Sequence, residues 1–344
     1  MDTVTLSPRE RLLARWAVLP DRMAALHERY ARYFWTVHSI WALLTGVAVL
    51  VLAHNRYGFI PWVITFLALT WATTLLFSRL ALAGSSRALR VARGFVSYLT
   101  RIMYQETLFF LLPFYFYSTT FPSWNCAFVL GLAALAALSC FDLLFDRLLR
   151  ESRAFALGFF AVVSFSALQF FLPVVLRVRV HHATYVAAVL AVLAAVPLAL
   201  PLKELKSRQT LLRLALLLFV TVAGARLILP FVPPVPLRLS RVRFAATFDP
   251  RTLRAEKEFV SDIPLSELAG GKLYAIATVF SPSHLPTALS LRFLHEGKAM
   301  RTSRTVELVA HPRGFRIWDL ARAGRGGFAP GRYLLEVRTS EGQL

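Results

Sequence analysis

The sequence predicts an α-helical transmembrane bundle of seven spans followed by a small all-β, sandwich-like domain. Hydrophobic residues make up 57% of the 344 positions and the mean hydropathy is +0.56, above the roughly half-apolar composition of soluble domains. Apolar runs of about twenty residues recur over the first two thirds of the chain. The last third alternates in polarity, as short strands do. Much of the chain is therefore expected to lie in lipid.

Seven apolar runs are each long enough to cross about 30 Å of hydrocarbon as a helix. Only helices and closed barrels satisfy the backbone polar groups inside a membrane, and these runs lack the alternation of barrel strands. The predicted spans are residues 34–53, 59–78, 95–118, 124–144, 154–175, 183–202 and 214–235. The expected domains are a helical segment at 1–33, a transmembrane domain at 34–236 and a β domain at 237–344.

The segment before the first span is predicted to be a cytoplasmic amphipathic helix. Ser7-Pro8-Arg9-Glu10 has the form of a capping box with proline at the first helical position. Apolar residues among arginines follow it, which favours a helix lying on the membrane surface. For the residues after Pro20, a solvated helix is an equally good interpretation.

The distribution of basic residues predicts the orientation of the chain. The N-terminal segment holds six Lys or Arg residues, and the segments before the third, fifth and seventh spans hold four, three and four, seventeen in all. The loops on the opposite side hold three. Under the positive-inside rule the N-terminus lies in the cytoplasm, and an odd number of spans places the C-terminal domain outside. Arg outnumbers Lys by 34 to 5, as in GC-rich bacterial genomes, so the expected location is a bacterial inner membrane.

Prolines near the ends of three spans indicate a weak internal repeat. Pro113, Pro173 and Pro230 are spaced by 60 and 57 residues, and each follows Phe, Leu or Ile residues. This spacing favours helical hairpins in which the outward helix carries proline in its last turns. Coincidence within apolar segments is the alternative interpretation.

The tail beyond residue 236 is predicted to form a β-sandwich of immunoglobulin-like general form. Candidate strands, separated by Gly, Pro and charged turns, are residues 242–248, 272–280, 288–295, 302–309, 315–320 and 332–338. Glu296-Gly297-Lys298 is predicted to be a hairpin loop. Cys126 and Cys140 both lie in one span, about 21 Å apart along a helix, so no disulfide stabilises this domain.

Three polar residues inside the spans are candidates for function: Glu106, Gln169 and Arg226. A charged side chain costs about 2.5–3.5 kcal/mol at the bilayer centre, so it needs a partner or a role. Their distances from the span prolines place all three within roughly 5 Å in depth. Arg226 could reach Glu106 if the third and seventh spans are neighbours. A structural ion pair, a substrate or proton path, and snorkelling are all consistent with this intramembrane polar layer.

No motif in the sequence points to catalysis, a cofactor or a metal ion. A Gly-rich phosphate loop after a strand, a Gly-x-Ser-x-Gly elbow and a His-Glu-x-x-His helix are all missing. His181 and His182 are adjacent, but their rings are expected to point apart, and no Cys, Asp or Glu nearby completes a ligand set. We expect no cofactor, and an enzyme is left open without being favoured.

The net charge of +20 does not indicate a nucleic-acid partner. The basic residues lie mainly in short segments between apolar runs rather than on one soluble face. The expected partners are the lipid bilayer and an envelope protein or glycan. The oligomeric state does not follow from the sequence.

Several short segments resemble an uncharacterised family of bacterial multi-pass membrane proteins. They are residues 104–114 (YQETLFFLLPF) and 167–173 (ALQFFLP), and in the tail 295–298 (HEGK), 315–318 (FRIW) and 331–337 (GRYLLEV). The resemblance implies a small β domain of unknown function after the last helix. It implies no activity. The family's tail often has tryptophans where this chain has Phe315 and Tyr333.

The leading functional hypothesis is a non-enzymatic envelope protein. In this interpretation the helical bundle anchors an external β domain that binds or senses another envelope component, by analogy with other recognition domains. A transporter or channel using the intramembrane polar layer is the alternative. A membrane enzyme acting on lipid or glycan has less support.

Overall fold

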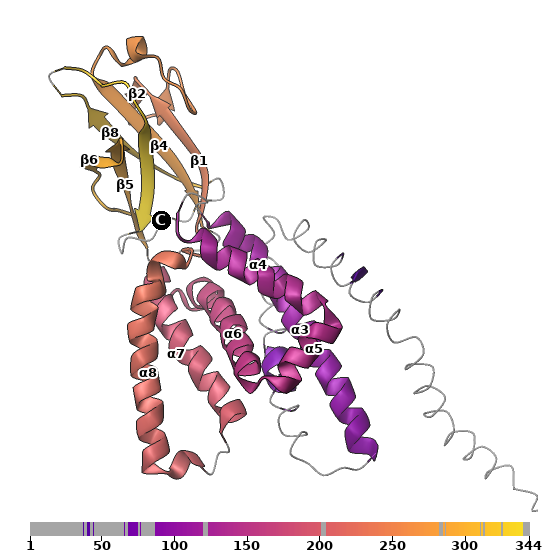
Figure 1. Ribbon diagram of the computed structural model, residues 1–344. Helices are drawn as coiled ribbons and strands as arrows, with labels where there is room; N and C mark the ends of the chain where they lie inside the picture. The colour runs from indigo at the N-terminus through magenta and orange to yellow at the C-terminus, as the bar shows by residue number, and fades with distance from the viewer. Residues whose placement is uncertain are drawn as a thin grey trace, which may run out of the picture.

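The computed structural model places a group of helices on one side of the molecule and a β domain on the other (Figure 1). The structure describes residues 87–119, 123–200, 204–281, 285, 287–309, 311, 314–324 and 326–339, together with residues 37, 40, 41, 44, 65, 68–74 and 76. The helix predicted at 1–33 lies outside the described residues. So do the spans predicted at 34–53 and 59–78, apart from those few positions, which are helical.

The helical part consists of longer helices that run toward the β domain (α3, α6, α8) or away from it (α4, α7), joined by shorter helical segments. They are α3 (Arg87–Tyr117), α4 (Cys126–Cys140), α5 (Asp142–Glu151), α6 (Arg153–Leu176), α7 (Val180–Ala199), the short η2 (Glu204–Lys206), α8 (Arg208–Ile228) and η3 (Leu229–Phe231). α3 ends below the β domain, where the guanidinium of Arg238 lies 4.6 Å from the centre of the Tyr117 ring. At the opposite end, Arg153 at the start of α6 donates to the carbonyl of Ala199 at the end of α7.

Among the described residues, three helical segments are long and apolar enough to cross a membrane: Arg153–Leu176, Val180–Ala199 and Arg208–Phe231. They correspond to the last three predicted spans. α3 covers the predicted span 95–118 and has the length, but it carries Arg101 and Glu106 near its middle. Seven spans are therefore not established. The prolines do lie near the ends of helices that run toward the β domain, with Pro113 in α3, Pro173 in α6 and Pro230 in η3.

The prediction of one continuous span at 124–144 is wrong. α4 ends at Cys140, Phe141 leaves the helical conformation with φ −89° and ψ 76°, and α5 begins at Asp142. The fifteen residues of α4 reach about 22 Å, less than the hydrocarbon thickness. In the sequence, apolar residues continue past the break, because α5 contains leucines between its charged residues. One side of α5 is buried through Phe145, whose ring centre lies 4.8 Å from that of Phe159.

α6 is the central helix of this region, and its ends are well defined. The Ser152 hydroxyl caps its start by accepting from the amide of Phe155. It ends where Arg177 adopts a left-handed conformation with φ 54°, so that the Val178 amide returns to the carbonyl of Leu172. All residues from Val163 to Pro173 are buried. α6 packs against α3, α5 and α7.

The β domain contains two main sheets. Sheet A has the order β1 (Arg238–Ala245), β4 (Lys272–Phe280), β8 (Phe315–Arg322), all antiparallel. In sheet C, β5 (Ala288–His295) pairs with β6 (Lys298–Thr302) and β7 (Val306–Glu307) along one edge and with β9 (Tyr333–Thr339) along the other. A small hairpin of β2 (Phe248–Asp249) and β3 (Arg254–Ala255) and the short η4 (Leu265–Leu268) complete the domain. β1 and β9 are therefore edge strands.

The predicted strands at 272–280 and 288–295 coincide with β4 and β5. The prediction at 302–309 is wrong, because β6 ends at Thr302 and the chain pairs again only at β7. The hairpin loop is confirmed: Glu296 and Gly297 both have positive φ, as a tight turn between β5 and β6 requires. Lys298 already belongs to β6.

The two sheets pack face to face around an apolar core that also includes one residue of the helical part. Ala277, Val279 and Ile317 of sheet A meet Leu289 and Leu291 of sheet C, as in a β-sandwich. Val180, the first residue of α7, is 1% exposed and belongs to the same core cluster, and so does Leu237. The β domain is therefore seated on the turn between α6 and α7.

Candidate functional site

The intramembrane polar layer does not assemble around an ion pair. Glu106 on α3 is half-buried, Gln169 on α6 is fully buried and Arg226 on α8 is exposed. The structure describes both Glu106 and Arg226, and these two side chains do not form an ion pair with each other. The physical reason is the packing order, since α8 lies beside α7 while α3 lies beside α4 and α6.

Gln169 is the one member of the layer with an unusual environment. Its Nε2 donates to the carbonyl of Val180 at 3.5 Å, a long contact. Its Oε1 is buried and accepts no hydrogen bond. A buried amide oxygen without a partner costs about 1–3 kcal/mol. This residue was identified from the sequence by its polarity alone, and the structure places it against the turn that supports the β domain.

A buried ion pair does occur, between the middle of α3 and α5. Arg101 on α3 lies 3.4 Å from the carboxylate of Asp146 on α5, and both side chains are largely buried. Sequence proximity favours Arg147 and Arg150 as partners of Asp146, but Arg147 pairs with Glu151 one turn along α5. The break at Phe141 makes the difference, because it turns α5 against α3.

The rings of His181 and His182 do not point apart. Their centres are 3.8 Å apart in the first turn of α7, where no preceding helical turn constrains the side chains. Among the residues that the structure describes, no three His, Cys, Asp or Glu side chains are grouped to hold a metal ion.

A polar cluster at the far tip of the sandwich has a structural explanation. Glu296 donates its amide to the carbonyl of Arg332 and accepts the Arg332 amide with its carboxylate. The His295 ring stacks on Tyr333 with ring centres 4.4 Å apart. Burial, with a smaller contribution from the Glu296 carboxylate, raises the pKa of Tyr333. These contacts hold the start of β9 on the β5–β6 hairpin.

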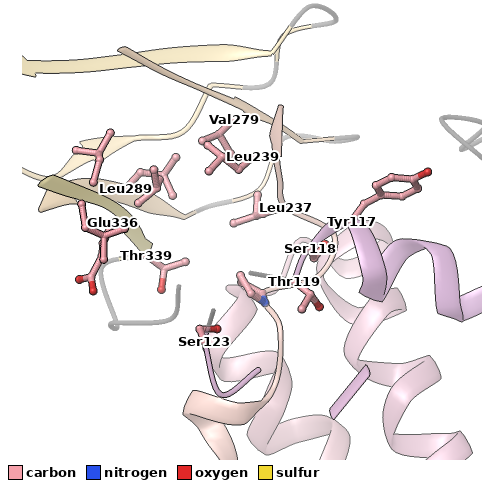
Figure 2. Close-up of a pocket in the computed structure, with 14 residues that line it drawn as sticks. Tyr117, Ser118, Thr119, Ser123, Leu237, Leu239, Val279, Leu289, Glu336 and Thr339 are labelled. Carbon is pink, nitrogen blue, oxygen red and sulfur yellow. The ribbon is translucent and has the colours of Figure 1, made fainter. Parts of the chain in front are cut away.

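A pocket lies where the helices meet the open side of the sandwich (Figure 2). Its volume is about 340 Å³. The helical part contributes the residues after α3 and before α4, and the β domain contributes β1, β4, β5 and β9. The lining residues are Tyr117, Ser118, Thr119, Ser123, Pro234, Leu237, Leu239, Val279, Leu289, Leu334, Leu335, Glu336, Val337 and Thr339.

The pocket exists because the edge strands β1 and β9 do not pair with each other. Leu239 on β1 and Leu334 on β9 remain 45% and 47% exposed, while Leu289 and Val279 at the back of the pocket are buried. Apolar side chains thus form its walls and part of its mouth. Hydroxyl groups of Ser118, Thr119 and Ser123 come from the helical side.

Charged groups stand at the border of the pocket. Arg238 lies over Tyr117, which lines the pocket. Glu336 also lines it and is held between two arginines, with Arg338 Nη2 at 2.8 Å and Arg292 Nη1 at 3.8 Å. This arrangement suits an elongated apolar ligand with a polar or anionic end.

Sequence reasoning did not identify this pocket. Its residues come from five separate segments, and Glu336 is the one charged residue among them. The local signal is in β9, where Leu334 and Leu335 are adjacent and break the alternation of a half-buried strand. That irregularity indicates an apolar side chain facing outward, but not what it faces.

The comparisons with known proteins yield one match. Residues 16–275 match a family of unknown function, DUF5924. The match extends from before the predicted first span into β4. It confirms the prediction that the chain belongs to an uncharacterised family. No curated protein and no solved structure matches the chain.

Proposed function

The chain belongs to the DUF5924 family, and we propose that it is a multi-pass envelope protein whose external β domain binds another envelope component without catalysis. The observation that carries this proposal is the pocket shared by the two parts of the molecule. It is apolar, it opens between unpaired edge strands, and both the helices and the sandwich build its walls. A pocket built from both parts is not expected if the β domain acts independently of the helices.

The proposed topology has the N-terminus in the cytoplasm and the β domain outside, in a bacterial inner membrane. The seventeen-to-three distribution of basic residues supports it. The alternating helix directions support it as well, since α3, α6 and α8 all end toward the β domain. The seven-span count requires α3 and the shorter α4 to cross, with α5 lying along the cytoplasmic surface.

A transporter or channel is the second candidate, and the unpartnered Gln169 oxygen is the observation that favours it. Polar groups buried in spans often line substrate or proton paths. The exposed position of Arg226 counts against a path built from all three residues of the layer. Binding at the junction is therefore the better supported function.

The test uses the full-length chain, because the sandwich core includes Val180 of the helical part. A photo-crosslinking amino acid at position 239, in the mouth of the pocket, should capture an envelope component in living cells. The matched control is position 260, whose valine is 66% exposed elsewhere on the β domain. Equal capture at both positions, or none at 239, would show that the pocket has no ligand.

The topology has its own test. A reporter fused after Leu344 should be active only outside the cytoplasm, whereas one placed before Asp2 should be active only inside. Cytoplasmic activity of the C-terminal fusion would contradict both the odd span count and an external binding domain.

A further inference from the structure

We propose that the ligand of the pocket is one acyl chain of an anionic phospholipid whose phosphate binds beside Arg238. The inference rests on the proposed function and specifies its ligand. It follows from the level of the pocket, its size and the charges at its border.

The pocket lies beside the ends of the apolar helices that face the β domain. Its helical lining comes from the residues that follow α3 and precede α4, and from Pro234 just after η3. Trp124, 75% exposed, lies at the same level, with its ring centre 6.0 Å from that of Phe231. Exposed aromatic rings at helix ends are typical of the membrane interface. Lipid headgroups would therefore surround the mouth of the pocket.

The size of the pocket suits part of a lipid and not a folded partner. Pockets for small ligands measure roughly 300–1,000 Å³, and this one, at about 340 Å³, is at the lower end. One chain can lie along the pocket from Leu239, near the helices, toward Leu334, near the tip of the sandwich; both side chains are exposed. The second chain of a phospholipid would remain in the bilayer beside α3.

The charges favour a phosphate at the mouth. Arg238 is the first residue of β1, and its guanidinium is stacked on the Tyr117 ring. Stacked arginines present planar N–H groups that suit phosphate oxygens. Around Glu336, two arginines face one carboxylate, which leaves a net positive charge. Residues 237–344 hold seventeen basic and ten acidic side chains, so the whole domain favours an anionic surface.

A peptide strand is the competing occupant, because within the described residues β9 pairs with β5 alone. The lipid is favoured because the pocket is bounded by helix ends as well as by strands, and the membrane supplies acyl chains there at high concentration. A captured polypeptide is therefore an outcome of the experiment that would overturn the inference.

The experiment is native mass spectrometry of the purified full-length protein in detergent with phosphatidylglycerol and, separately, phosphatidylcholine of identical chains. We expect one phosphatidylglycerol to bind about tenfold more tightly, equivalent to 1.4 kcal/mol. Leu239→Trp should fill the mouth and weaken both lipids at least tenfold. Leu265→Trp, at an equally exposed leucine in η4, is the matched control and should change neither.

The headgroup is tested by a second pair of variants. Arg238→Gln should abolish the preference for phosphatidylglycerol and leave phosphatidylcholine binding intact. Arg241→Gln, on the same strand and exposed, should have no effect. Lipid binding that is unchanged by Leu239→Trp, or a preference that survives Arg238→Gln, would overturn the inference.

The two proposals fail in different ways. If the crosslink at position 239 captures a polypeptide or a glycan and the purified protein retains no lipid, the lipid inference is wrong while the binding function stands. If position 239 captures nothing and no lipid binds, both are wrong.

Discussion

α6 and α8 are equally apolar, yet the fold uses them in opposite ways. Both candidate spans are 24 residues long and both have a mean hydropathy of 2.2 over their most apolar stretch. Of that stretch, 67% is buried inside the protein in α6 and 11% in α8. α6 has α3, α5 and α7 around it, whereas among the described helices α8 packs mainly on α7. Hydropathy alone does not distinguish an enclosed helix from a peripheral one.

The polar residues of the two helices differ in the same way. α6 encloses Ser164, Ser166 and Gln169, all at most 1% exposed, and Ser166 accepts the Tyr115 hydroxyl with its carbonyl at 2.8 Å. In α8, the Thr221 hydroxyl donates to the Leu217 carbonyl of its own helix, and Arg226 is exposed. The Ser166 hydroxyl donates within α6, to the Val162 carbonyl, as Thr221 does within α8, but the Ser164 hydroxyl of α6 also accepts from the indole of Trp71. The enclosed helix thus has polar contacts with its neighbours in addition to its own.

The largest expected effect concerns two arginines of the helices, Arg101 on α3 and Arg226 on α8. Arg101→Met removes the guanidinium that lies 3.4 Å from the Asp146 carboxylate in a largely buried site, at an expected cost of about 3–5 kcal/mol in the free energy of unfolding. Arg226→Met, at an exposed position of α8, should change that free energy by less than about 0.5 kcal/mol. Unfolding measured by steric trapping in bicelles compares the two.

A double variant separates the ion pair from the local packing around Arg101. Arg101→Met combined with Asp146→Leu leaves no lone charge and should regain most of the stability. If the double variant is as unstable as Arg101→Met alone, the pair is not what stabilises the contact between α3 and α5.

A smaller effect is expected for phenylalanines of the two helices. Phe170 is fully buried, with its ring centre 4.6 Å from that of Phe114, and Phe219 on α8 is 72% exposed. Phe→Ala in a packed core costs about 3–5 kcal/mol in water-soluble proteins, but in lipid only the packing contribution is lost. We expect about 2 kcal/mol for Phe170→Ala and near zero for Phe219→Ala. Equal losses would mean that α8 packs against a further partner.

The smallest effect is expected at Gln169, and its sign is opposite. Gln169→Leu removes a buried oxygen that accepts no hydrogen bond, so the free energy of unfolding should stay the same or rise by about 1 kcal/mol. Thr221→Val in α8 is the matched control and should be neutral, because its hydroxyl serves only its own helix. A clear loss of stability in Gln169→Leu would show that the amide has a partner in the native membrane.

Local features of the chain were the ones that could be predicted. The strand limits of β4 and β5 follow from alternation between turn residues, and the tight turn at Glu296-Gly297 follows from its composition. The break at Phe141 could not be predicted, because the apolar run continues across it. α4 ends because Phe145 packs against α6 and Asp146 pairs with Arg101 of α3. No local property of the sequence encodes these contacts.

The sequence by itself determined which segments are apolar enough for lipid, how unevenly the basic residues are distributed between the loops, and where alternating strands replace helices. Each of these depends on neighbouring residues and on the solvent. Only the tertiary structure decided that α6 is enclosed while α8 is peripheral, that Arg101 rather than Arg226 is paired, and that β1 and β9 leave a pocket above the helices. The reason is that an apolar side chain is equally well satisfied by lipid and by protein, so its neighbours are chosen by the packing of the whole chain.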